Sequence, residues 1–206
     1  MRCFAGIDSG SWNTKAVVIN EDAHVLGTAV VRSGADLPAA AARALENALA
    51  AAAVGGADVA AVWSTGFGRR TVEIADGSRT ELDCHARGVS HYLTGPLVIV
   101  DIGGQDAKVI RLDAENRRIS HKMNRKCAAG TGSFLEEIAL RLGVDIGALD
   151  ALAAGSTEDI ELGSFCTVFA GTEMLSLIRS GRRPADLARA AYRSLVKRVF
   201  EMEVLE

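Results

Sequence analysis

The sequence predicts an α/β fold that contains two copies of one strand–turn–strand unit. The 206 residues include 21 glycines and only 5% aromatic residues, a composition typical of α/β nucleotide-binding chains. Residues 4–19 and 96–112 follow the same plan: an apolar strand, an aspartate, a glycine turn, small polar residues, a lysine and a second strand. From residue 133 onward, apolar residues recur at helical spacing.

Composition and charge exclude several classes of protein. With 49% hydrophobic and 24% charged residues, the chain is able to bury the core of one large domain or two small ones. A net charge of −3 gives no indication of a nucleic-acid partner. No apolar run approaches the ~18–20 residues of a membrane helix, and the N-terminus leads straight into a strand rather than a signal peptide. We therefore expect a cytoplasmic protein whose four cysteines are reduced thiols or metal ligands.

The first half of the chain predicts a meander of strands followed by alternating helices and strands. Apolar runs flank a polar turn at 9–15 and indicate antiparallel strands at 2–8, 16–20 and within 21–32. The alanine-rich run that follows carries Leu45 and Leu49 on one stripe, with Pro38 in its first turn, which predicts a helix. The expected elements are helix 38–53, strand 58–66, a short strand at 71–76 and helix 80–93.

The plan restarts after Thr94-Gly95-Pro96, where we place a domain boundary. The first nucleotide-binding subdomain is predicted at 1–95 and the second at 96–206. Residues 96–112 contain a buried strand that ends in Asp101, a Gly-Gly turn and a second strand. Helices are expected at 133–142, 145–154, 166–180 and 184–203, separated by turns at Gly143, Gly155 and Gly181.

Two glycine turns have the pattern of phosphate-binding loops. DSGSWNTK (8–15) and DIGGQDAK (101–108) each place an aspartate and a lysine around a turn between two strands. Glycine lets the backbone approach a phosphate, the amide N–H groups and the lysine bind it, and the aspartate holds Mg²⁺ through water. One such turn is weak evidence, because Asp-x-Gly turns are common in hairpins. Two of them predict the phosphate clamp of the actin/hexokinase/Hsp70-type nucleotide-binding fold; the alternative is a pair of hairpins without a ligand.

Cys127 and Cys166 each stand at the start of a predicted helix. Helix N-termini present free N–H groups and partial positive charge, which stabilise thiolates and indicate a metal or redox site. The alternative for any single cysteine is a small buried hydrophobe, which we expect for Cys3 and accept for Cys84. Two cysteines do not complete a four-ligand zinc or iron–sulfur site, and no histidine has ligand-like spacing to either. Two copies of the chain supply four thiolates, which predicts a homodimer with one shared site.

Six strings along the chain resemble those of one protein family. They are GIDSGSWNTKAVV, STGFGR, TELDCHARG, VDIGGQDAKVI, NRKCAAGTGSFLE and CTVFAGTE. Together they are similar to the activator ATPases of 2-hydroxyacyl-CoA dehydratases, the BadF/BadG/BcrA/BcrD-type group, which includes the ATPase subunits of benzoyl-CoA reductase. The resemblance implies the acetate and sugar kinase/Hsc70/actin fold with duplicated ribonuclease-H-like domains. It also implies a homodimer bridged by one 4Fe–4S cluster, in which ATP hydrolysis drives a low-potential electron into a partner enzyme.

The resemblance also implies roles for single residues. Cys127 and Cys166 would be the cluster ligands, and Asp8, Asp101 and Gln105 would be catalytic. The residues expected to bind ATP or ADP with Mg²⁺ are Ser9, Gly10, Ser11, Thr14, Lys15, Gly103, Gly104 and Gln105. The implied partners are a 2-hydroxyacyl-CoA dehydratase or a benzoyl-CoA reductase-type component, with ferredoxin or flavodoxin as electron donor; no nucleic acid or membrane is implied.

The chain departs from the family pattern at its end. Family members continue into a Gly-Gly strand turn that contacts the adenosine and a last helix, and nothing before Glu206 matches that piece. We therefore expect a C-terminally truncated form of the fold that keeps the phosphate turns and cluster cysteines, with adenine binding and ATPase activity open. Two alternatives remain: a sugar or N-acetylhexosamine kinase of the same fold, and a cluster-carrying module that lacks ATPase activity.

Overall fold

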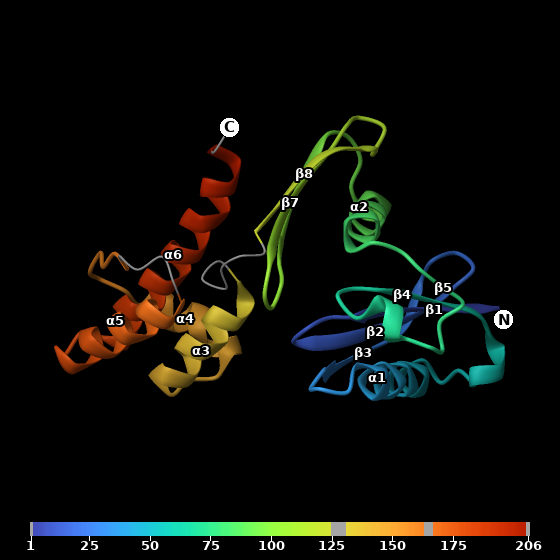
Figure 1. Cartoon of the computed structure of the whole chain (residues 1–206), viewed down its shortest axis with the longest axis horizontal. Coiled ribbons are helices and arrows are strands. Elements are labelled where there is room, and N and C mark those ends of the chain that lie inside the picture. The colour runs from blue at the N-terminus through green and yellow to red at the C-terminus, as the bar shows by residue number, and fades with distance from the viewer. Residues whose placement is uncertain (1, 125–130, 163–166, 205–206) are drawn as a thin grey trace. The chain divides into compact units, whose positions relative to one another are not determined.

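This computed structural model describes residues 2–124, 131–162 and 167–204. The chain divides into two units, Met1–Thr94 and Gly95–Glu206, which are coloured from blue to green and from green to red in Figure 1. Each unit combines a β-sheet with α-helices, so the predicted α/β class is confirmed. Within the described ranges, no helix joins the length and the apolar composition that a membrane span requires.

A five-stranded sheet forms the first unit, in the order β3-β2-β1-β4-β5. Its strands are β1 (Cys3–Ser9), β2 (Asn13–Asn20), β3 (Val25–Arg32), β4 (Val59–Thr65) and β5 (Gly77–Ser78). The first three form the predicted antiparallel meander, β4 pairs in parallel with β1, and β5 pairs in parallel with β4. The predicted turn at 9–15 is too long, because Ser9 and residues 13–15 pair within the sheet. Only residues 10–12 remain for the turn, and this places Asp8 directly opposite Lys15.

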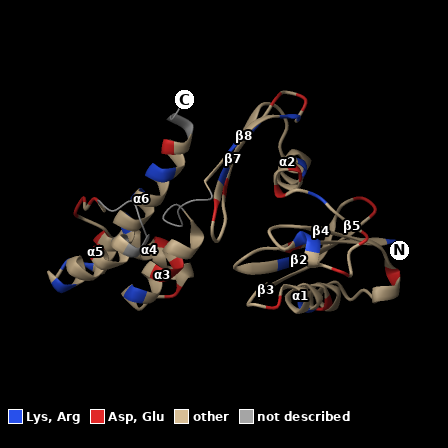
Figure 2. Ribbon diagram, in the orientation of Figure 1, with Lys and Arg blue, Asp and Glu red and all other residues tan. Residues whose placement is uncertain are grey.

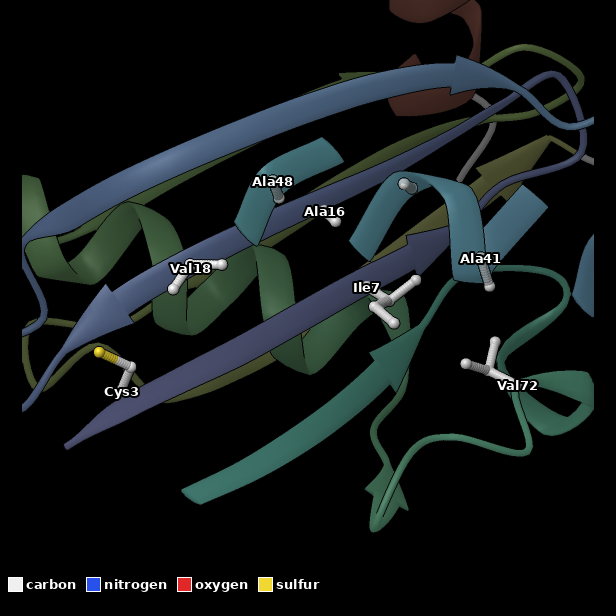
Figure 3. Close-up of a cluster of buried hydrophobic side chains, with 8 residues drawn as sticks. Cys3, Ile7, Ala16, Val18, Ala41, Ala48 and Val72 are labelled. Carbon is white, nitrogen blue, oxygen red and sulfur yellow. The ribbon is translucent and has the colours of Figure 1, made fainter. Parts of the chain in front are cut away.

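Helix α1 (Leu37–Ala52) covers one face of this sheet. Asp36 caps its N-terminus by accepting a backbone N–H of the first turn at 2.9 Å, and Pro38 lies in that turn as predicted. The helix is almost free of charged residues and packs through alanines (Figure 2, Figure 3). A Cβ on Gly27 of β3 would lie 2.5 Å from the Ala48 carbonyl oxygen, so this close packing requires glycine. The buried core of the unit consists of Cys3, Ile7, Ala16, Val18, Ala41, Ala44, Ala48 and Val72.

The segment after β4 differs from the predicted short strand at 71–76. It forms the 3-10 helix η2 (Arg69–Thr71) and then turns into β5. Val72 is 5% exposed and packs in the core, whereas Asp76 pairs with the edge of β4 by accepting the Val62 N–H on its Oδ2 at 2.8 Å. Val72 and Ile74 alternate with Thr71 and Glu73 in the sequence as they would in a strand, which explains the error. The remaining elements are η1 (Gly56–Asp58) and α2 (Glu81–Tyr92).

The second unit begins with an antiparallel sheet in the order β6-β7-β8. Its strands are β6 (Leu97–Ile102), β7 (Ala107–Leu112) and β8 (Arg118–Asn124). The first two strands are predicted by the sequence, but β8 is not. Four of its seven residues are exposed, and its sequence, RISHKMN, lacks the apolar alternation that identifies a half-buried strand. The central strand β7 is buried at all but one position.

Four α-helices complete the second unit. They are α3 (Gly132–Leu142), α4 (Leu149–Ala154), α5 (Thr167–Arg179) and α6 (Pro184–Val204), with the 3-10 turn η4 (Ile146–Ala148) before α4. Helix α6 packs against the other three and against β7 and β8. The predicted apolar stripe of α3 is confirmed, since Phe134 and Ile138 are almost fully buried. The core comprises Phe134, Ile138, Leu162, Met174, Leu187, Ala190 and Ala191.

A buried carboxylate in α6 fixes the segment that follows α4. Asp186 is 1% exposed, and its Oδ1 accepts hydrogen bonds from the Ser156 hydroxyl and from the N–H groups of Thr157 and Glu158, at 2.8–2.9 Å. The Glu158 N–H is the largest cause that lowers the pKa of Asp186, and burial of the carboxyl opposes it. The negative charge of Asp186 is therefore part of the packing of this unit.

Candidate functional site

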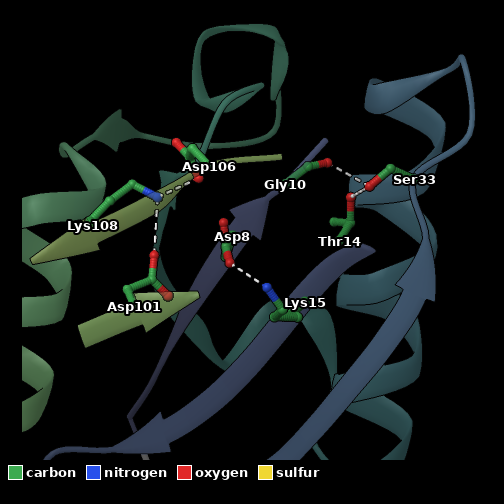
Figure 4. Close-up of polar contacts among 8 residues, drawn as sticks. All are labelled: Asp8, Gly10, Thr14, Lys15, Ser33, Asp101, Asp106 and Lys108. Carbon is green, nitrogen blue, oxygen red and sulfur yellow. Dashed lines mark hydrogen bonds and ion pairs between the residues drawn. The ribbon is translucent and has the colours of Figure 1, made fainter. Parts of the chain in front are cut away.

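The first candidate region is the hairpin turn between β1 and β2 (Figure 4). Asp8 of β1 lies opposite Lys15 of β2, and the Asp8 Oδ2 and Lys15 Nζ atoms are 2.9 Å apart. The two side chains are accessible, with 34% of Asp8 and 54% of Lys15 exposed. An exposed ion pair contributes only about 0–1 kcal/mol to stability. Lys15 is therefore able to leave Asp8 for an anionic ligand at low energetic cost.

Two other predicted residues of this turn point into the protein. The side chains of Ser9 and Thr14 are fully buried, because successive residues of a strand point to opposite faces of the sheet. The Thr14 Oγ1 lies 2.9 Å from the Ser33 Oγ, and the Ser33 hydroxyl donates to the Gly10 carbonyl oxygen at 2.6 Å (Figure 4). These hydrogen bonds hold the turn on its buried side. Ser9 and Thr14 can thus offer a ligand their backbone only, whereas Ser11 is half-buried within the turn.

Residues 64–69, the string STGFGR, pack against this turn. The Gly68 N–H donates to the Ser9 carbonyl oxygen at 2.8 Å. Gly66 has a φ of +91°, and a Cβ there would lie 2.4 Å from the Asp8 Oδ1. Thr65 lies beside Asp8 where β4 pairs with β1, and its hydroxyl is buried without a hydrogen-bond partner among the described residues. Sequence reasoning assigned these residues no role, although a Gly-x-Gly pattern directly after a strand is a signal for such a turn.

The second candidate region is the hairpin turn between β6 and β7, and it repeats the register of the first. Asp101 lies opposite Lys108, seven residues later, as Asp8 lies opposite Lys15. The Gly103 N–H donates to the Asp106 carbonyl oxygen at 2.8 Å and closes the turn. Gly103 and Gly104 are half-buried, and Gln105 is exposed at the tip.

The lysine of the second turn is buried, unlike that of the first. Only 2% of the Lys108 side chain is exposed, and its Nζ lies 3.0 Å from the Asp101 Oδ2 and 2.8 Å from the Asp106 Oδ1 (Figure 4). The two carboxylates are partly exposed, at 20% and 29%. This contact brings two carboxylates to one ammonium. Sequence reasoning did not single out Asp106, which lies within the DIGGQDAK string.

The second turn is also joined to the start of α3. The Gly132 N–H, the first of the helix, donates to the Gly103 carbonyl oxygen at 2.8 Å. Thr131 is the N-cap residue and is fully buried, and its Oγ1 lies 3.1 Å from the Ser133 Oγ. The sequence predicted either Thr131 or Ser133 at this cap. The hydrogen bond fixes the N-terminus of α3 to the glycine turn.

The predicted metal ligands Cys127 and Cys166 lie outside the described residues. In sequence they precede Gly132 and Thr167, the first residues of α3 and α5. Cys3 is 1% exposed in the core of the first unit, as predicted, and Cys84 is half-buried on α2. Across the described ranges, no three histidine, cysteine, aspartate or glutamate side chains come together to form a metal site with three protein ligands.

The chain is similar in sequence to known proteins over most of its length. Residues 5–204 match the BadF/BadG/BcrA/BcrD ATPase family. A 2-hydroxyisocaproyl-CoA dehydratase activator from Clostridioides difficile is 36% identical over 194 residues, which are 94% of this chain and 73% of that protein.

Two solved structures share the fold. The Acidaminococcus fermentans (R)-2-hydroxyglutaryl-CoA dehydratase component A superposes with a TM-score of 0.90 at 35% identity, covering 98% of this chain and 78% of that one. The activator of the 2-hydroxyisocaproyl-CoA dehydratase from Clostridium difficile, with bound ADPNP, gives a TM-score of 0.91 at 35% identity, covering 97% and 74%. The fold predicted from the sequence, of the actin/hexokinase/Hsp70 type, is thereby confirmed.

Proposed function

The chain belongs to the BadF/BadG/BcrA/BcrD ATPase family, and on that premise we propose that it is an ATP-dependent activator that delivers a low-potential electron to a partner enzyme. The partner would be a 2-hydroxyacyl-CoA dehydratase or a benzoyl-CoA reductase-type component. Relatives that are named as activators of such dehydratases support this, and so does a relative whose structure holds ADPNP. One of the subunits of a benzoyl-CoA reductase from Thauera aromatica is 27% identical over 70% of this chain.

The observation that carries the proposal is the repeated hairpin register. Each unit contains a hairpin whose two strands are joined by a glycine turn. In both hairpins an aspartate on the first strand lies opposite a lysine on the second. Each of the two turns offers backbone N–H groups and a carboxylate, the groups that bind a phosphate and its metal ion. An acid opposite a lysine also stabilises a hairpin without a ligand, so the support for a ligand lies in the recurrence of this pair beside a glycine turn in both units.

In this proposal the first turn binds phosphate directly. Lys15 is exposed and loosely held, so its ammonium is able to contact a phosphate oxygen. The backbone N–H groups of residues 9–11 are the other donors. Asp8 and Asp101 are partly exposed carboxylates next to glycine turns, which fits Mg²⁺ held through water beside a nucleotide. When bound, Mg²⁺ would supply charge neutralisation at the phosphates, and Gln105 lies at an exposed tip where it is able to orient water.

Cys127 and Cys166 are proposed as the ligands of a 4Fe–4S cluster shared by two copies of the chain. Two thiolates from each copy give the four ligands that such a cluster takes, and they stand before the N-termini of α3 and α5. The cluster would supply one-electron chemistry. The helix N-termini would stabilise its negative charge.

The contact between the second turn and α3 offers a route from nucleotide to electron transfer. A ligand that moves the turn also moves the Gly103 carbonyl oxygen, and with it the Gly132 N–H at the start of α3. Cys127 is five residues before Gly132 in the chain. Nucleotide affects the cysteine segment in this way only to the extent that it binds the two arrangements with different affinity.

Anaerobic purification followed by an ATPase assay tests the proposal. We expect about four irons per two chains and phosphate release from ATP without any added acceptor. Cys127→Ala should lose the iron, and Asp8→Asn should keep it while hydrolysis falls by roughly 10²-fold or more. Consumption of ATP only with an added sugar would indicate a kinase. Iron without hydrolysis would indicate a cluster-carrying module, and a colourless monomer would contradict the shared cluster.

A further inference from the structure

Lys108 is an unusual residue for the interior of this protein. Among the residues that the structure describes, only Lys108 and Asp186 are charged and as buried as the hydrophobic core. Removing an ammonium from water costs several kcal/mol, and an ion pair in the interior often returns no net stability. Apolar residues in place of the lysine and both of its acids would therefore serve folding at least as well. A role beyond stability follows from what the ammonium contacts.

The Lys108 ammonium joins two acids that belong to different parts of the turn. Asp101 lies near the end of β6, and Asp106 lies in the turn itself (Figure 4). Without a cation between them, two carboxylates that both lie within 3.0 Å of one Nζ atom would repel each other. A Cβ on Gly103 would lie 2.8 Å from the Asp106 Oδ1, so the glycine is needed for Asp106 to reach the ammonium. The backbone and Lys108 together set where both carboxylates lie.

The first hairpin contains an accessible lysine at the same register position, which allows a comparison with Lys108. Lys15 has the same cross-strand partner position, contacts one carboxylate and is 54% exposed. Lys108 contacts two carboxylates and is 2% exposed. To contact a phosphate, Lys108 would have to leave both acids and uncover buried surface, which Lys15 need not do. The two lysines are therefore suited to different tasks.

We propose that Lys108 is a positioning residue of the nucleotide site, which holds Asp101 and Asp106 as a fixed pair of acids for the Mg²⁺ that accompanies the nucleotide, and that it does not bind phosphate. This inference rests on the proposed function. The two carboxylates are partly exposed, and Mg²⁺ commonly takes one or two carboxylates together with phosphate oxygens and water. Residues that orient metal-binding carboxylates typically change metal affinity 10–100-fold when they are removed.

Binding of ADP, measured by calorimetry with and without Mg²⁺, tests this assignment. The assay uses wild type, Lys108→Met and Lys15→Met, first in EDTA and then in excess Mg²⁺. In wild type, Mg²⁺ should tighten ADP binding by a measurable factor. Lys108→Met should leave the dissociation constant in EDTA unchanged and reduce the Mg²⁺ factor by roughly tenfold or more. Lys15→Met should weaken binding in both buffers and keep the factor.

Each other outcome overturns a defined part of the inference. If Lys108→Met weakens ADP binding in EDTA, Lys108 binds phosphate. If the Mg²⁺ factor stays the same or rises, Lys108 is a core ion pair or a competing charge rather than a positioning residue. If wild type binds no ADP in either buffer, the proposed function fails, and the role of Lys108 fails with it. Should Lys108→Met not fold, Lys108→Met/Asp106→Asn removes one acid with the ammonium and carries the same two titrations, with the same expected loss of the factor.

Discussion

The two hairpins have the same register and differ in how much of each is buried. In the first, Asp8 and Lys15 form an exposed ion pair, and hydrogen bonds of the Thr14 and Ser33 hydroxyls hold the buried side of the turn. In the second, Lys108 is buried between Asp101 and Asp106. One sequence pattern, Asp followed seven residues later by Lys, thus gives an exposed cation in one copy and a buried one in the other. The supports also differ, since residues 64–69 hold the first turn and the N-terminus of α3 holds the second.

The largest expected effect is a difference in the free energy of unfolding between variants of the two lysines. Lys108→Met leaves two partly buried carboxylates without their cation, which costs up to about 3–5 kcal/mol. Lys15→Met removes an exposed pair and should change the free energy of unfolding by only about 0–1 kcal/mol. Urea unfolding of both variants measures the difference. Equal losses would mean that burial does not distinguish the hairpins.

Residues 64–69 should no longer hold the first turn in place when Gly66 is replaced. Gly66→Ala places a Cβ against the Asp8 carboxylate at a φ of +91° and should destabilise the first unit by about 1–3 kcal/mol. It should also weaken ADP binding, because Asp8 is displaced. Gly88→Ala is the control: nothing lies within 4 Å of the added Cβ in α2, and helix propensity should raise stability by up to about 1 kcal/mol. A neutral Gly66→Ala would show that residues 64–69 do not fix the turn.

The second turn is joined to α3 by the hydrogen bond from the Gly132 N–H, which a substitution at Gly132 removes. Gly132→Pro deletes the N–H that binds the Gly103 carbonyl oxygen, and proline is tolerated as the first residue of a helix. Thr131 is already extended, with a φ of −131° and a ψ of 164°, as the residue before proline prefers. The proline Cδ would also take the place of the hydrogen and force the Gly103 carbonyl oxygen away, so we expect a loss of roughly 1–3 kcal/mol.

The functional consequence is the sharper part of this prediction. ATP hydrolysis should continue in Gly132→Pro, while electron delivery to the partner enzyme becomes independent of nucleotide. Gly132→Ala keeps the N–H and should retain coupling, since its Cβ lies at an ordinary 3.4 Å from the Gly103 oxygen. Normal nucleotide dependence in the proline variant would exclude this hydrogen bond as the route.

The smallest effect at neutral pH concerns Asp186, the other buried charge of the second unit. Its pKa is below the ordinary value of 3.8, so its charge adds stability that is complete above that value and lost as pH falls through the folded-state pKa. Asp186→Asn should lower the melting temperature modestly at pH 7. The difference from wild type should shrink below about pH 4, as thermal melts across pH would record. A constant difference would show that the charge itself adds nothing.

The sequence predicted the parts of the site that depend on local pattern. Asp8, Lys15, Asp101 and the glycine turns follow from strand and turn chemistry within about eight residues. The burial of Lys108 does not, because it depends on what packs over the sheet, and the two strings DSGSWNTK and DIGGQDAK carry no sign of that difference. The inward direction of Ser9 and Thr14 was also missed, since the turn was predicted too long and the strand alternation was not extended to them.

The fold shows the same difference between features set by local sequence pattern and features set by long-range packing. Helices α1 and α3 were predicted by their apolar stripes and start signals, whereas β8 was missed because most of its residues face water. The false strand at 71–76 arose from the alternation of Val72 and Ile74 with polar residues, whereas Val72 and Asp76 reach the core and the edge of β4 through a turn. Long-range packing, rather than local preference, decided each of these cases.

The seven-residue spacing of the hairpins also makes turn length part of the chemistry. Side chains alternate between the faces of a sheet, so a single inserted residue that the turn at 10–12 did not absorb by lengthening would shift the register of β2 and rotate every later side chain of that strand to the opposite face. Lys15 would then point toward α1, and Thr14 would take its place beside Asp8. Substitutions within such a turn change one contact at a time, whereas an insertion or deletion of one residue exchanges the whole set. Variation among related sequences should therefore be freer in the residues of these turns than in their number.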